Sequence, residues 1–261
     1  MTDWLATCRA ATEDVRGVLG GMPGRLEREP VVGAGLGGDD TTAVDEAAER
    51  VVLERFRGLG ARIVSEEAGE LGEGELTVVV DPIDGSLNAK RGIPHFALSI
   101  AVAEGRTMGD VFFGYVYDFG WGEEWTATRG EGARLNGELL PEQRPKDRIE
   151  LLSFEATLTS EVADKAAAMV GIAHRIRIFG SLALSLCQLA AGRLDGVVSL
   201  KPIRSVDVAA AQLLVRERGL AIELVDGDSL LEAPLDVTAR SRIAAAGTPD
   251  LCRTLAQALR S

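Results

Sequence analysis

The feature that most constrains the fold of this chain is an apolar run, residues 76–80, that is followed directly by a segment with two acidic residues. Residues 76–80 (Leu-Thr-Val-Val-Val) are rich in β-branched side chains, which is typical of a buried strand. The next residues, 81–86, read Asp-Pro-Ile-Asp-Gly-Ser. A buried strand therefore delivers Asp81 at its carboxyl end, Pro82 stiffens the backbone, and Asp84 arrives one turn later facing the same space. The chain must fold around two acids in one small volume.

This pair of carboxylates calls for a counter-charge, because like charges at such range raise each other's pKa unless a cation lies between them. Gly85 allows close approach of the backbone, and Ser86 can open a helix whose free N–H groups accept an anion. Residues 81–86 thus supply candidate metal ligands, a hydroxyl group and a phosphate cradle. The same segment also fits a plain Asp-Gly turn after a strand.

Further acids stand at the ends of other predicted elements. Glu66 and Glu67 follow a short strand expected at residues 62–64. They either complete a cluster with Asp81 and Asp84 or lie on an exposed loop. Asp207 stands among apolar residues where a helix begins, so it is either an N-terminal cap or a ligand that points into a cleft. Asp45 ends a Thr-x-x-Asp capping box, and for this motif alone capping is the simpler interpretation.

The charge balance excludes several classes of partner. The 261 residues carry 40 acidic and 28 basic side chains, a formal net charge of −12, and this field repels nucleic-acid backbones and anionic membrane surfaces. It also repels a phosphorylated metabolite, so a phosphate site needs a local cation such as Mg²⁺ or a few placed Lys and Arg side chains. No apolar run approaches the roughly 18 residues of a membrane span. We therefore expect neither a nucleic acid nor a membrane as partner.

The cysteines and the first residues bear on the compartment. Cys8, Cys187 and Cys252 are far apart and odd in number, which argues against a disulfide framework and against a Cys-rich zinc site. The opening residues, Met-Thr-Asp-Trp-Leu, lack the basic-then-apolar order of a signal peptide. Both features favour a reducing cytoplasm.

Hydrophobic periodicity predicts two kinds of organisation along the chain. The first half combines helices with a meandering antiparallel sheet, and the second alternates strands with helices, so we expect an α+β subdomain at 1–138 and an α/β subdomain at 139–261. A Gly- and Pro-rich stretch at residues 22–41 is expected to be a mobile loop. The expected helices are 3–18, 43–58, 160–170, 181–191, 207–218 and 248–259, and the expected strands are 62–64, 76–80, 96–102, 110–117, 123–128, 149–154, 174–178, 194–199 and 241–245.

The glycines of that stretch offer a competing function. Gly33, Gly35 and Gly38 match the dinucleotide-binding fingerprint, which would make the chain an NAD-binding oxidoreductase. The fingerprint needs a full strand before it, whereas only two valines precede it here, and Asp39 and Asp40 would repel the pyrophosphate. A flexible flap over the metal site explains the same glycines.

Taken together, the motifs resemble those of the inositol monophosphatase family in the fructose-1,6-bisphosphatase-like superfamily. The resemblance covers nearly the whole chain and is carried by Thr42-x-x-Asp45, Ser65-Glu66-Glu67, residues 81–86, Gly92-Ile93-Pro94 and Asp207 with the Val-Ala-Ala-Ala that follows it. Residues 88–94 and 130–136 are most similar to a branch best known from archaea, whose members act on both inositol monophosphates and fructose 1,6-bisphosphate. The resemblance implies a layered αβαβα sandwich of the sugar-phosphatase type, a homodimer, and a metal-dependent phosphomonoesterase.

The resemblance also implies roles for individual residues. The ligands of two or three Mg²⁺ ions, with Mn²⁺ as an alternative, would be Glu66, Asp81, Asp84, Asp207 and the backbone carbonyl of Ile83. Hard divalent cations prefer such oxygen ligands, and paired metals can clamp the attacking and leaving oxygens of a phosphoryl transfer. The implied catalytic residues are Asp45 and Ser86, which would orient the attacking water, and Glu66. The implied substrate contacts are Asp84, Gly85, Ser86, Arg177, Leu182 and Lys201.

One departure from the family bears on the substrate. Animal inositol monophosphatases carry a Glu seven residues before the last Asp, where it holds inositol hydroxyls, and this chain has Leu200 there with Lys201 beside it. The change favours a ligand with a second phosphate or a broader range of ligands. We expect inositol 1-phosphate, fructose 1,6-bisphosphate or both as substrates, with nucleotide phosphates such as NADP⁺ or 3′-phosphoadenosine phosphate as the alternative.

Overall fold

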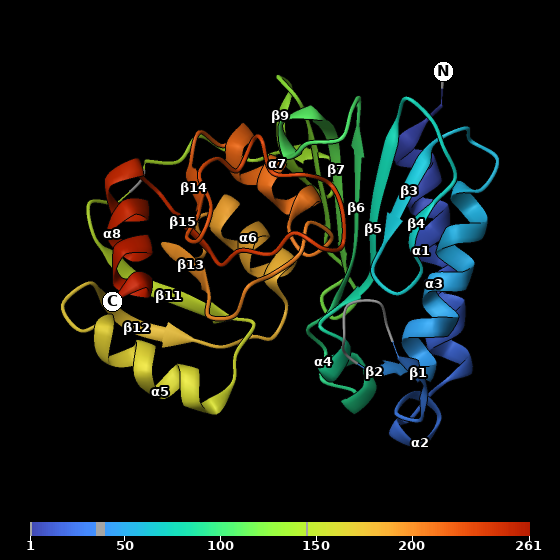
Figure 1. Ribbon diagram of the computed structural model, residues 1–261, viewed down its shortest axis with the longest axis horizontal. Helices are drawn as coiled ribbons and strands as arrows, with labels where there is room; N and C mark the ends of the chain where they lie inside the picture. The colour runs from blue at the N-terminus through green and yellow to red at the C-terminus, as the bar shows by residue number, and fades with distance from the viewer. Residues whose placement is uncertain (1, 35–39, 145) are drawn as a thin grey trace.

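The computed structural model describes residues 2–34, 40–144 and 146–261, and in these ranges helices and sheets alternate in layers (Figure 1). An outer pair of helices covers an eight-stranded sheet, a second pair lies between that sheet and a five-stranded sheet, and a third pair covers the far face. In that order the pairs are α1 (Trp4–Gly21) with α3 (Ala43–Phe56), α6 (Leu182–Ala190) with α7 (Ala209–Glu217), and α5 (Thr159–Ala168) with α8 (Pro249–Arg260). The predicted αβαβα sandwich is confirmed.

The eight-stranded sheet is antiparallel except at one pair of strands. Its order is β10-β9-β8-β7-β6-β5-β3-β4, and β3 and β5 run parallel. The strands are β3 (Arg62–Ser65), β4 (Gly69–Leu71), β5 (Thr77–Asp84), β6 (Ala97–Ala103), β7 (Val111–Asp118), β8 (Glu124–Thr128), β9 (Gly132–Leu135) and β10 (Glu138–Leu139). The antiparallel meander predicted over residues 96–128 is confirmed, and the short β4, β9 and β10 were not predicted. The parallel pair brings two carboxyl ends to one edge of the sheet.

The inner helices α6 and α7 are buried on nearly every side because a sheet covers each of their faces. Their sequences accordingly lack the polar stripe of a surface helix. Close packing of α7 on the first sheet depends on Gly114 of β7, where an added Cβ would lie 2.6 Å from the carbonyl oxygen of Ala210. This contact fixes the position of α7 and of the loop that precedes it.

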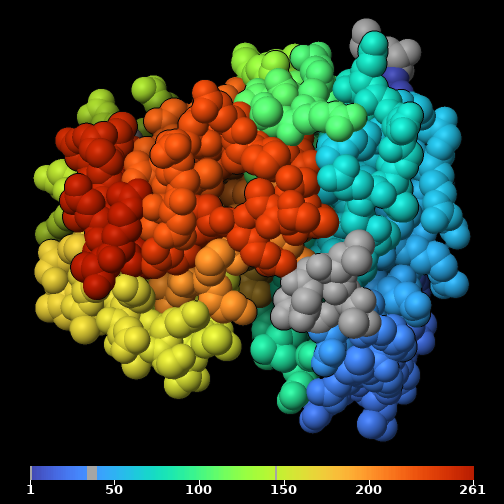
Figure 2. Space-filling model, viewed as in Figure 1, coloured from blue at the N-terminus to red at the C-terminus, as the bar shows by residue number. Residues whose placement is uncertain are grey.

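The five-stranded sheet carries the second half of the chain, in the order β12-β11-β13-β15-β14. Its strands are β11 (Ile149–Glu155), β12 (Ala173–Arg177), β13 (Gly196–Ser199), β14 (Ala221–Leu224) and β15 (Ile243–Ala246). β11 pairs in parallel with β12 and β13, and the remaining pairs are antiparallel. In the space-filling view this half lies directly against the first sheet (Figure 2). A division into subdomains at residues 138 and 139 stays a prediction.

The predicted mobile loop at residues 22–41 is wrong for the part that the structure describes. It contains α2 (Arg25–Arg28) and β1 (Val31–Ala34), and β1 pairs antiparallel with β2 (Asp40–Thr42). The prolines and glycines therefore mark the ends of short elements, and the paired valines form a strand. Gly35, Gly38 and Asp39 of the dinucleotide fingerprint lie outside the described residues. Within the described ranges no helix combines the length and apolar character needed to cross a bilayer.

Candidate active site

The parallel pairing of β3 with β5 places the first acids of the site. Ser65 lies opposite Val80 in the register, so the next residues, Glu66 and Asp81, lie at the same edge, where β3 ends and β5 continues to Asp84. Strand β5 then loses its regular register with β6 between Asp81 and Asp84, as expected where a proline removes a backbone donor. The strand ends at Asp84, beyond which the chain turns towards α4 (Ser86–Arg91).

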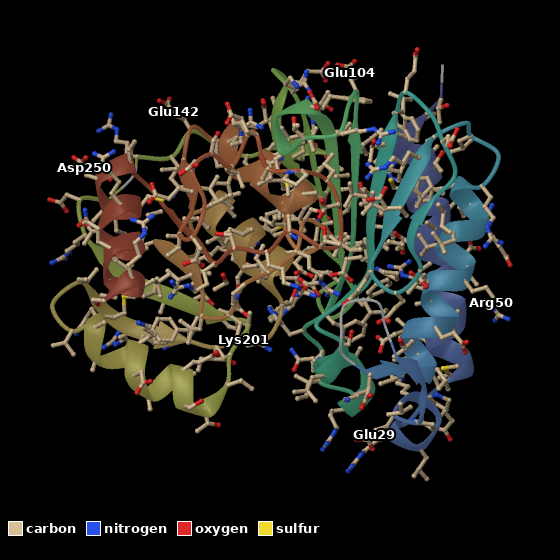
Figure 3. All side chains as sticks on the ribbon, in the orientation of Figure 1. Glu29, Arg50, Glu104, Glu142, Lys201 and Asp250 are labelled. Atoms are coloured by element: carbon tan, nitrogen blue, oxygen red, sulfur yellow. The ribbon has the colours of Figure 1, made fainter. Side chains whose placement is uncertain are left out.

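A cavity of about 380 Å³ opens at this edge, between the two halves of the chain. It is lined by most of the predicted site residues, namely Glu66, Asp81, Ile83, Asp84, Gly85, Ser86, Leu182, Lys201 and Asp207. Lys201, labelled in Figure 3, extends from the second half towards the first. The structure therefore brings together residues from four distant stretches of sequence around one space.

Asp84 is held by the amino end of α6. The Ser181 hydroxyl donates a hydrogen bond to Asp84 Oδ2 at 2.5 Å, and the backbone N–H of Ala183 donates to the same oxygen at 2.7 Å. A helix amino terminus favours negative charge, so both the bonds and the helix dipole support an ionised carboxylate. Burial nevertheless dominates and raises the pKa of Asp84 to about 7, against the lowering by these two bonds. The carboxyl thus retains a strong tendency to attract a cation or a proton.

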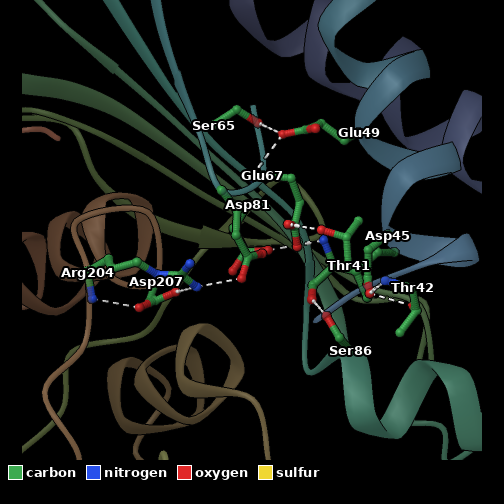
Figure 4. Close-up of polar contacts among 12 residues, drawn as sticks. Thr41, Thr42, Asp45, Glu49, Ser65, Glu67, Asp81, Ser86, Arg204 and Asp207 are labelled. Carbon is green, nitrogen blue, oxygen red and sulfur yellow. Dashed lines mark hydrogen bonds and ion pairs between the residues drawn. The ribbon is translucent and has the colours of Figure 1, made fainter. Parts of the chain in front are cut away.

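Glu66 and Asp207 share one arginine, Arg204, which Figure 4 shows beside Asp207. A terminal nitrogen of Arg204, Nη2, donates to Glu66 Oε1 and, at 3.2 Å, to Asp207 Oδ1. The backbone N–H of Arg204 also donates to Asp207 Oδ2 at 2.6 Å. Burial raises the pKa of Glu66 to about 7, with Arg204 opposing the rise and Asp207 adding to it. The pKa of the Arg204 guanidinium lies above its ordinary value, since these carboxylate charges outweigh the lowering by burial.

Asp81 is almost completely buried, with 2% of its surface exposed. Its Oδ1 accepts the backbone N–H of Ile83 at 3.1 Å, which closes a local turn. Burial, followed by the negative charges of Glu66, Asp84 and Asp207, raises its pKa well above the ordinary value. The other three carboxylates are therefore near enough for their charges to influence the ionisation of Asp81.

The chemistry of this donor set fits divalent cations, which prefer carboxylate and carbonyl oxygens. Burial first, and then the nearby negative charges, raise the pKa values of Glu66, Asp81 and Asp84, so a bound cation would favour their ionised forms. In the arrangement described, however, no three His, Cys, Asp or Glu side chains of residues 2–34, 40–144 and 146–261 are close enough to enclose an ion. The guanidinium of Arg204 lies between two of the expected ligands, so ion binding requires these side chains to rearrange.

One carboxylate oxygen of Asp45 caps a helix, and the other has no hydrogen-bond partner among the described residues. Its Oδ2 accepts from the backbone N–H of Thr42 at 3.2 Å and from the Thr42 hydroxyl at 2.5 Å, as in a capping box. Its Oδ1 is buried and has no hydrogen-bond partner among the described residues. Figure 4 shows Asp45 on the same side of the site as Ser86, whose hydroxyl donates to the carbonyl of Ile83 at 2.9 Å. Asp45 itself does not line the cavity.

Arg177 is the predicted substrate contact that the structure does not bring to this cavity. It lies at the end of the edge strand β12 and lines another cavity, together with Lys146, Arg175 and Arg193. Its guanidinium donates to the carbonyl of Ile176 at 3.0 Å.

Sequence reasoning missed Glu155, the last residue of β11, which lines the cavity and is completely buried. Its carboxylate accepts from the hydroxyls of Ser153 at 2.7 Å and Ser185 at 2.6 Å, and from the backbone N–H of Gly180 at 2.9 Å. It thereby holds the turn that precedes Ser181. An acid at the end of an apolar strand was the available signal, the same one that pointed to Asp81.

Two other missed residues also position parts of the site. Asn88 of α4 donates through Nδ2 to the carbonyls of His95 at 2.8 Å and Phe179 at 2.7 Å, which ties the two halves together. Glu49 accepts from the Ser65 hydroxyl at 2.5 Å and from the N–H groups of residues 67 and 68, which fixes the turn after β3. Glu67 turns aside and accepts from the Thr41 hydroxyl, so Glu66 is the acid of that pair that reaches the cavity.

Comparison with known proteins agrees with the motifs. The sequence model of the inositol monophosphatase family matches residues 7–261. A fructose-1,6-bisphosphatase/inositol-1-monophosphatase of Thermococcus kodakarensis is 36% identical over 231 residues, 88% of this chain and 86% of the relative. One of the same name from Archaeoglobus fulgidus is 36% identical over 247 residues, 94% of this chain and 93% of the relative. The crystal structure of the MJ0109 gene product, an inositol monophosphatase-fructose 1,6 bisphosphatase, has a TM-score of 0.87 at 29% identity and covers 98% of this chain and 100% of its own.

Proposed function

The chain belongs to the inositol monophosphatase family, and on that premise we propose that it is a Mg²⁺-dependent phosphomonoesterase that hydrolyses small sugar or inositol phosphates. The family is generally metal-dependent. The observation that carries the proposal is the cavity of about 380 Å³ into which both halves of the chain direct carboxylates. Similarity to relatives named for fructose-1,6-bisphosphatase and inositol-1-monophosphatase activity supports the same reaction.

The proposed ligands of two or three Mg²⁺ ions are Glu66, Asp81, Asp84, Asp207 and the carbonyl oxygen of Ile83, with Mn²⁺ as an alternative metal. When bound, divalent ions supply Lewis-acid chemistry, which favours ionisation of water and neutralises the charge of the phosphate ester. The side chains come from β5 and from the ends of β3 and of the loop before α7, and all four line one cavity, which supports this choice of ligands. An acidic chain can hold an anionic substrate only with such local positive charge.

The chain's own residues orient the attacking water and the ester. Asp45 is fixed through one carboxylate oxygen by Thr42, which leaves Oδ1 free to accept a proton or hydrogen bond from water. The Ser86 hydroxyl lies at the start of α4 and lines the cavity, where it would hold the same water. Glu66 completes the catalytic set proposed here. The backbone of Gly85 and Ser86 lies where a phosphate group would dock.

The proposed substrates are inositol 1-phosphate, fructose 1,6-bisphosphate or both. Lys201 lines the cavity and gives a cation for a second phosphate, while Leu182 adds an apolar contact. Leu200 is buried, with 4% of its surface exposed, so it does not replace the hydroxyl-binding Glu of animal members. Nucleotide phosphates such as NADP⁺ remain the alternative class. Arg177, which the resemblance also implies as a contact, lines a different cavity, and its contact with substrate stays a prediction.

The proposal is tested by phosphate release from a panel of these compounds at fixed Mg²⁺. We expect turnover of at least one sugar or inositol phosphate, loss of turnover with EDTA, and recovery when Mg²⁺ is restored. Turnover of the nucleotide phosphates alone would favour the alternative substrate class. No turnover of any compound by folded, Mg²⁺-loaded protein would overturn the enzyme assignment.

We further propose that the protein is a homodimer in the cytoplasm. The dimer rests on the resemblance to the family, and the compartment rests on Cys8, Cys187 and Cys252, which are buried and free as in a reducing environment. Light scattering of the purified protein tests the dimer, and cell fractionation tests the compartment.

A further inference from the structure

We propose that Arg204 is a built-in cation that occupies part of the acidic cluster when metal ions are absent and leaves it when they bind. It would then set the metal affinity of the site through competition for Glu66 and Asp207. The inference rests on the proposed function, because it takes these two acids as metal ligands.

The position of the guanidinium carries the first step. The Arg204 side chain is 9% exposed, and its Nη2 contacts a carboxylate oxygen of Glu66 and one of Asp207. Glu66 follows β3 in the first half, and Asp207 precedes α7 in the second, so the guanidinium bridges the halves in the way that a shared metal ion would. Asp207 keeps a second bond, from the Arg204 backbone N–H at 2.6 Å, which does not depend on the side chain. Removal of the guanidinium therefore leaves Asp207 in place.

Charge carries the second step. A guanidinium beside two carboxylates offsets their mutual repulsion in the metal-free protein. A bound divalent cation would offset the same repulsion. The two cations cannot share these oxygens, because the positive charges repel each other and the guanidinium blocks the approach to Glu66 Oε1. Metal binding must therefore break the Arg204 contacts, and the free energy of those contacts is subtracted from the metal affinity.

A second cavity gives the side chain a place to move. Arg204 lines the site cavity and also a neighbouring cavity of about 290 Å³. The neighbour is lined by the acids Asp226, Asp228 and Glu232, of which Asp226 already pairs with Arg242. Arg204 thus lies in the wall between two cavities that both have acids in their lining, and Arg240 lines both as well. A rotation about its side-chain bonds would move the guanidinium from one set of carboxylates towards the other.

The test compares Arg204→Gln and Arg204→Lys with a matched control, Arg62→Gln. Arg62 is also a buried arginine, with a side chain 6% exposed against 9% for Arg204, and it pairs with Glu70 and the carbonyl of Leu235 away from the site cavity. Titration calorimetry measures the affinity for Mg²⁺ and Mn²⁺, and thermal melting measures each protein without metal and with saturating Mg²⁺.

We expect Arg204→Gln to bind metal about tenfold more tightly than the unaltered protein, a change of about 1.4 kcal/mol. Its melting temperature should fall without metal, and the rise on adding Mg²⁺ should be about 3–6 °C larger. Arg204→Lys keeps a charge and should lie between the two. Arg62→Gln should lower both melting temperatures equally and leave the metal affinity unchanged.

Equal or weaker metal binding by Arg204→Gln would overturn the inference, as would a loss of stability that is the same with and without Mg²⁺. The first result would assign Arg204 to supporting the bound ions, and the second to holding the fold. Failure of the unaltered protein to bind Mg²⁺ or to release phosphate would instead overturn the proposed function. The unaltered protein therefore separates the two failures.

Discussion

Asp84 and the pair formed by Glu66 and Asp207 lie at the same cavity, and the chain neutralises them in different ways. Asp84 accepts from a hydroxyl and a backbone N–H at the start of α6, which are neutral donors. Glu66 and Asp207 share the charged guanidinium of Arg204. A carboxylate that is held by neutral donors has no cation to displace and keeps its second oxygen for an ion. A carboxylate that is paired with a cation must first lose that partner.

The difference divides the cavity into a fixed side and an exchangeable side. On the fixed side, buried Glu155 holds the turn before Ser181, and Ser181 holds Asp84. On the exchangeable side, the loop before α7 brings both Asp207 and the arginine that competes for it. A site of this kind can keep its shape without metal while its charge balance changes, so that the effects of mutation should differ between the two sides.

The largest effect is expected at Asp84, on the fixed side. Asp84→Asn keeps the size of the side chain but removes the charge and exchanges one acceptor oxygen for a donor. We expect phosphate release to fall at least about 10²- to 10³-fold, as when a group that stabilises transition-state charge is removed. Circular dichroism should show the folded spectrum. A variant that retains more than a tenth of the activity would show that Asp84 is not a metal ligand.

A smaller loss is expected at Glu155, one step further from the ions. Glu155→Gln places an amide NH₂ among the donors Ser153, Ser185 and Gly180, so at least one donor loses its acceptor. We expect kcat/KM to fall about 10- to 100-fold, the range for residues that orient metal ligands, and stability to fall by about 1–3 kcal/mol.

The matched control for Glu155 is Asp195→Asn. Asp195 likewise accepts two backbone N–H groups, those of Glu150 and Leu151, but outside the site cavity. It should lose stability without losing kcat/KM. Equal kinetic losses in the two variants would show that Glu155 acts only through the overall fold.

Local sequence was sufficient to predict the fixed geometry of residues 81–86. A β-branched run sets a buried strand, proline and glycine set its end, and serine opens the next helix, so every step depends on near neighbours. The place of Glu66 was left open by its own segment, because an acid after a strand can equally lie on an exposed loop, and the parallel pairing of β3 with β5 decided it. For the same reason the order of helices and strands was predicted well, whereas β14, with four half-buried residues, gave too weak a pattern.

The partners of these residues could not be predicted, because they depend on how distant elements pack. Ser181 lies 97 residues from Asp84, and Arg204 lies 138 residues from Glu66. Neither separation has a signature in the sequence. Arg177 shows another limit: the family resemblance implied a substrate contact, whereas its place on the edge strand β12, beside another cavity, was not foreseen.

The pH dependence of stability distinguishes protons from metal ions as the counter-charge. The folded-state pKa values of Glu66 and Asp84 are about 7, against ordinary values of 4.5 and 3.8. Between about pH 4 and 7 the folded chain therefore binds more protons than the unfolded chain, and this contribution to stability is lost as the pH rises. We expect the melting temperature of metal-free protein to fall across this window, and saturating Mg²⁺ to remove the fall.

Glu66→Gln and Asp84→Asn separate the two sides of the cavity in that experiment, because each removes one titrating carboxyl. Each variant should show a smaller decline between pH 5 and 7 than the unaltered protein. A melting temperature that rises through this window in all three metal-free proteins would contradict the raised pKa values. A decline that persists unchanged in one variant would assign the protons to the other acid.

The smallest effect is expected from Ser181→Ala, for which the chain offers a close control. Ser181 and Thr248 both cap a helix by accepting the backbone N–H three residues on, at 3.3 Å in each case. Loss of either cap should cost about 1 kcal/mol of stability. Only Ser181 also donates to Asp84, so Ser181→Ala should lower kcat/KM several-fold while Thr248→Ala leaves it unchanged. If both variants keep full activity, the N–H of Ala183 alone is enough to hold Asp84, and the fixed side depends on the helix terminus rather than on the hydroxyl.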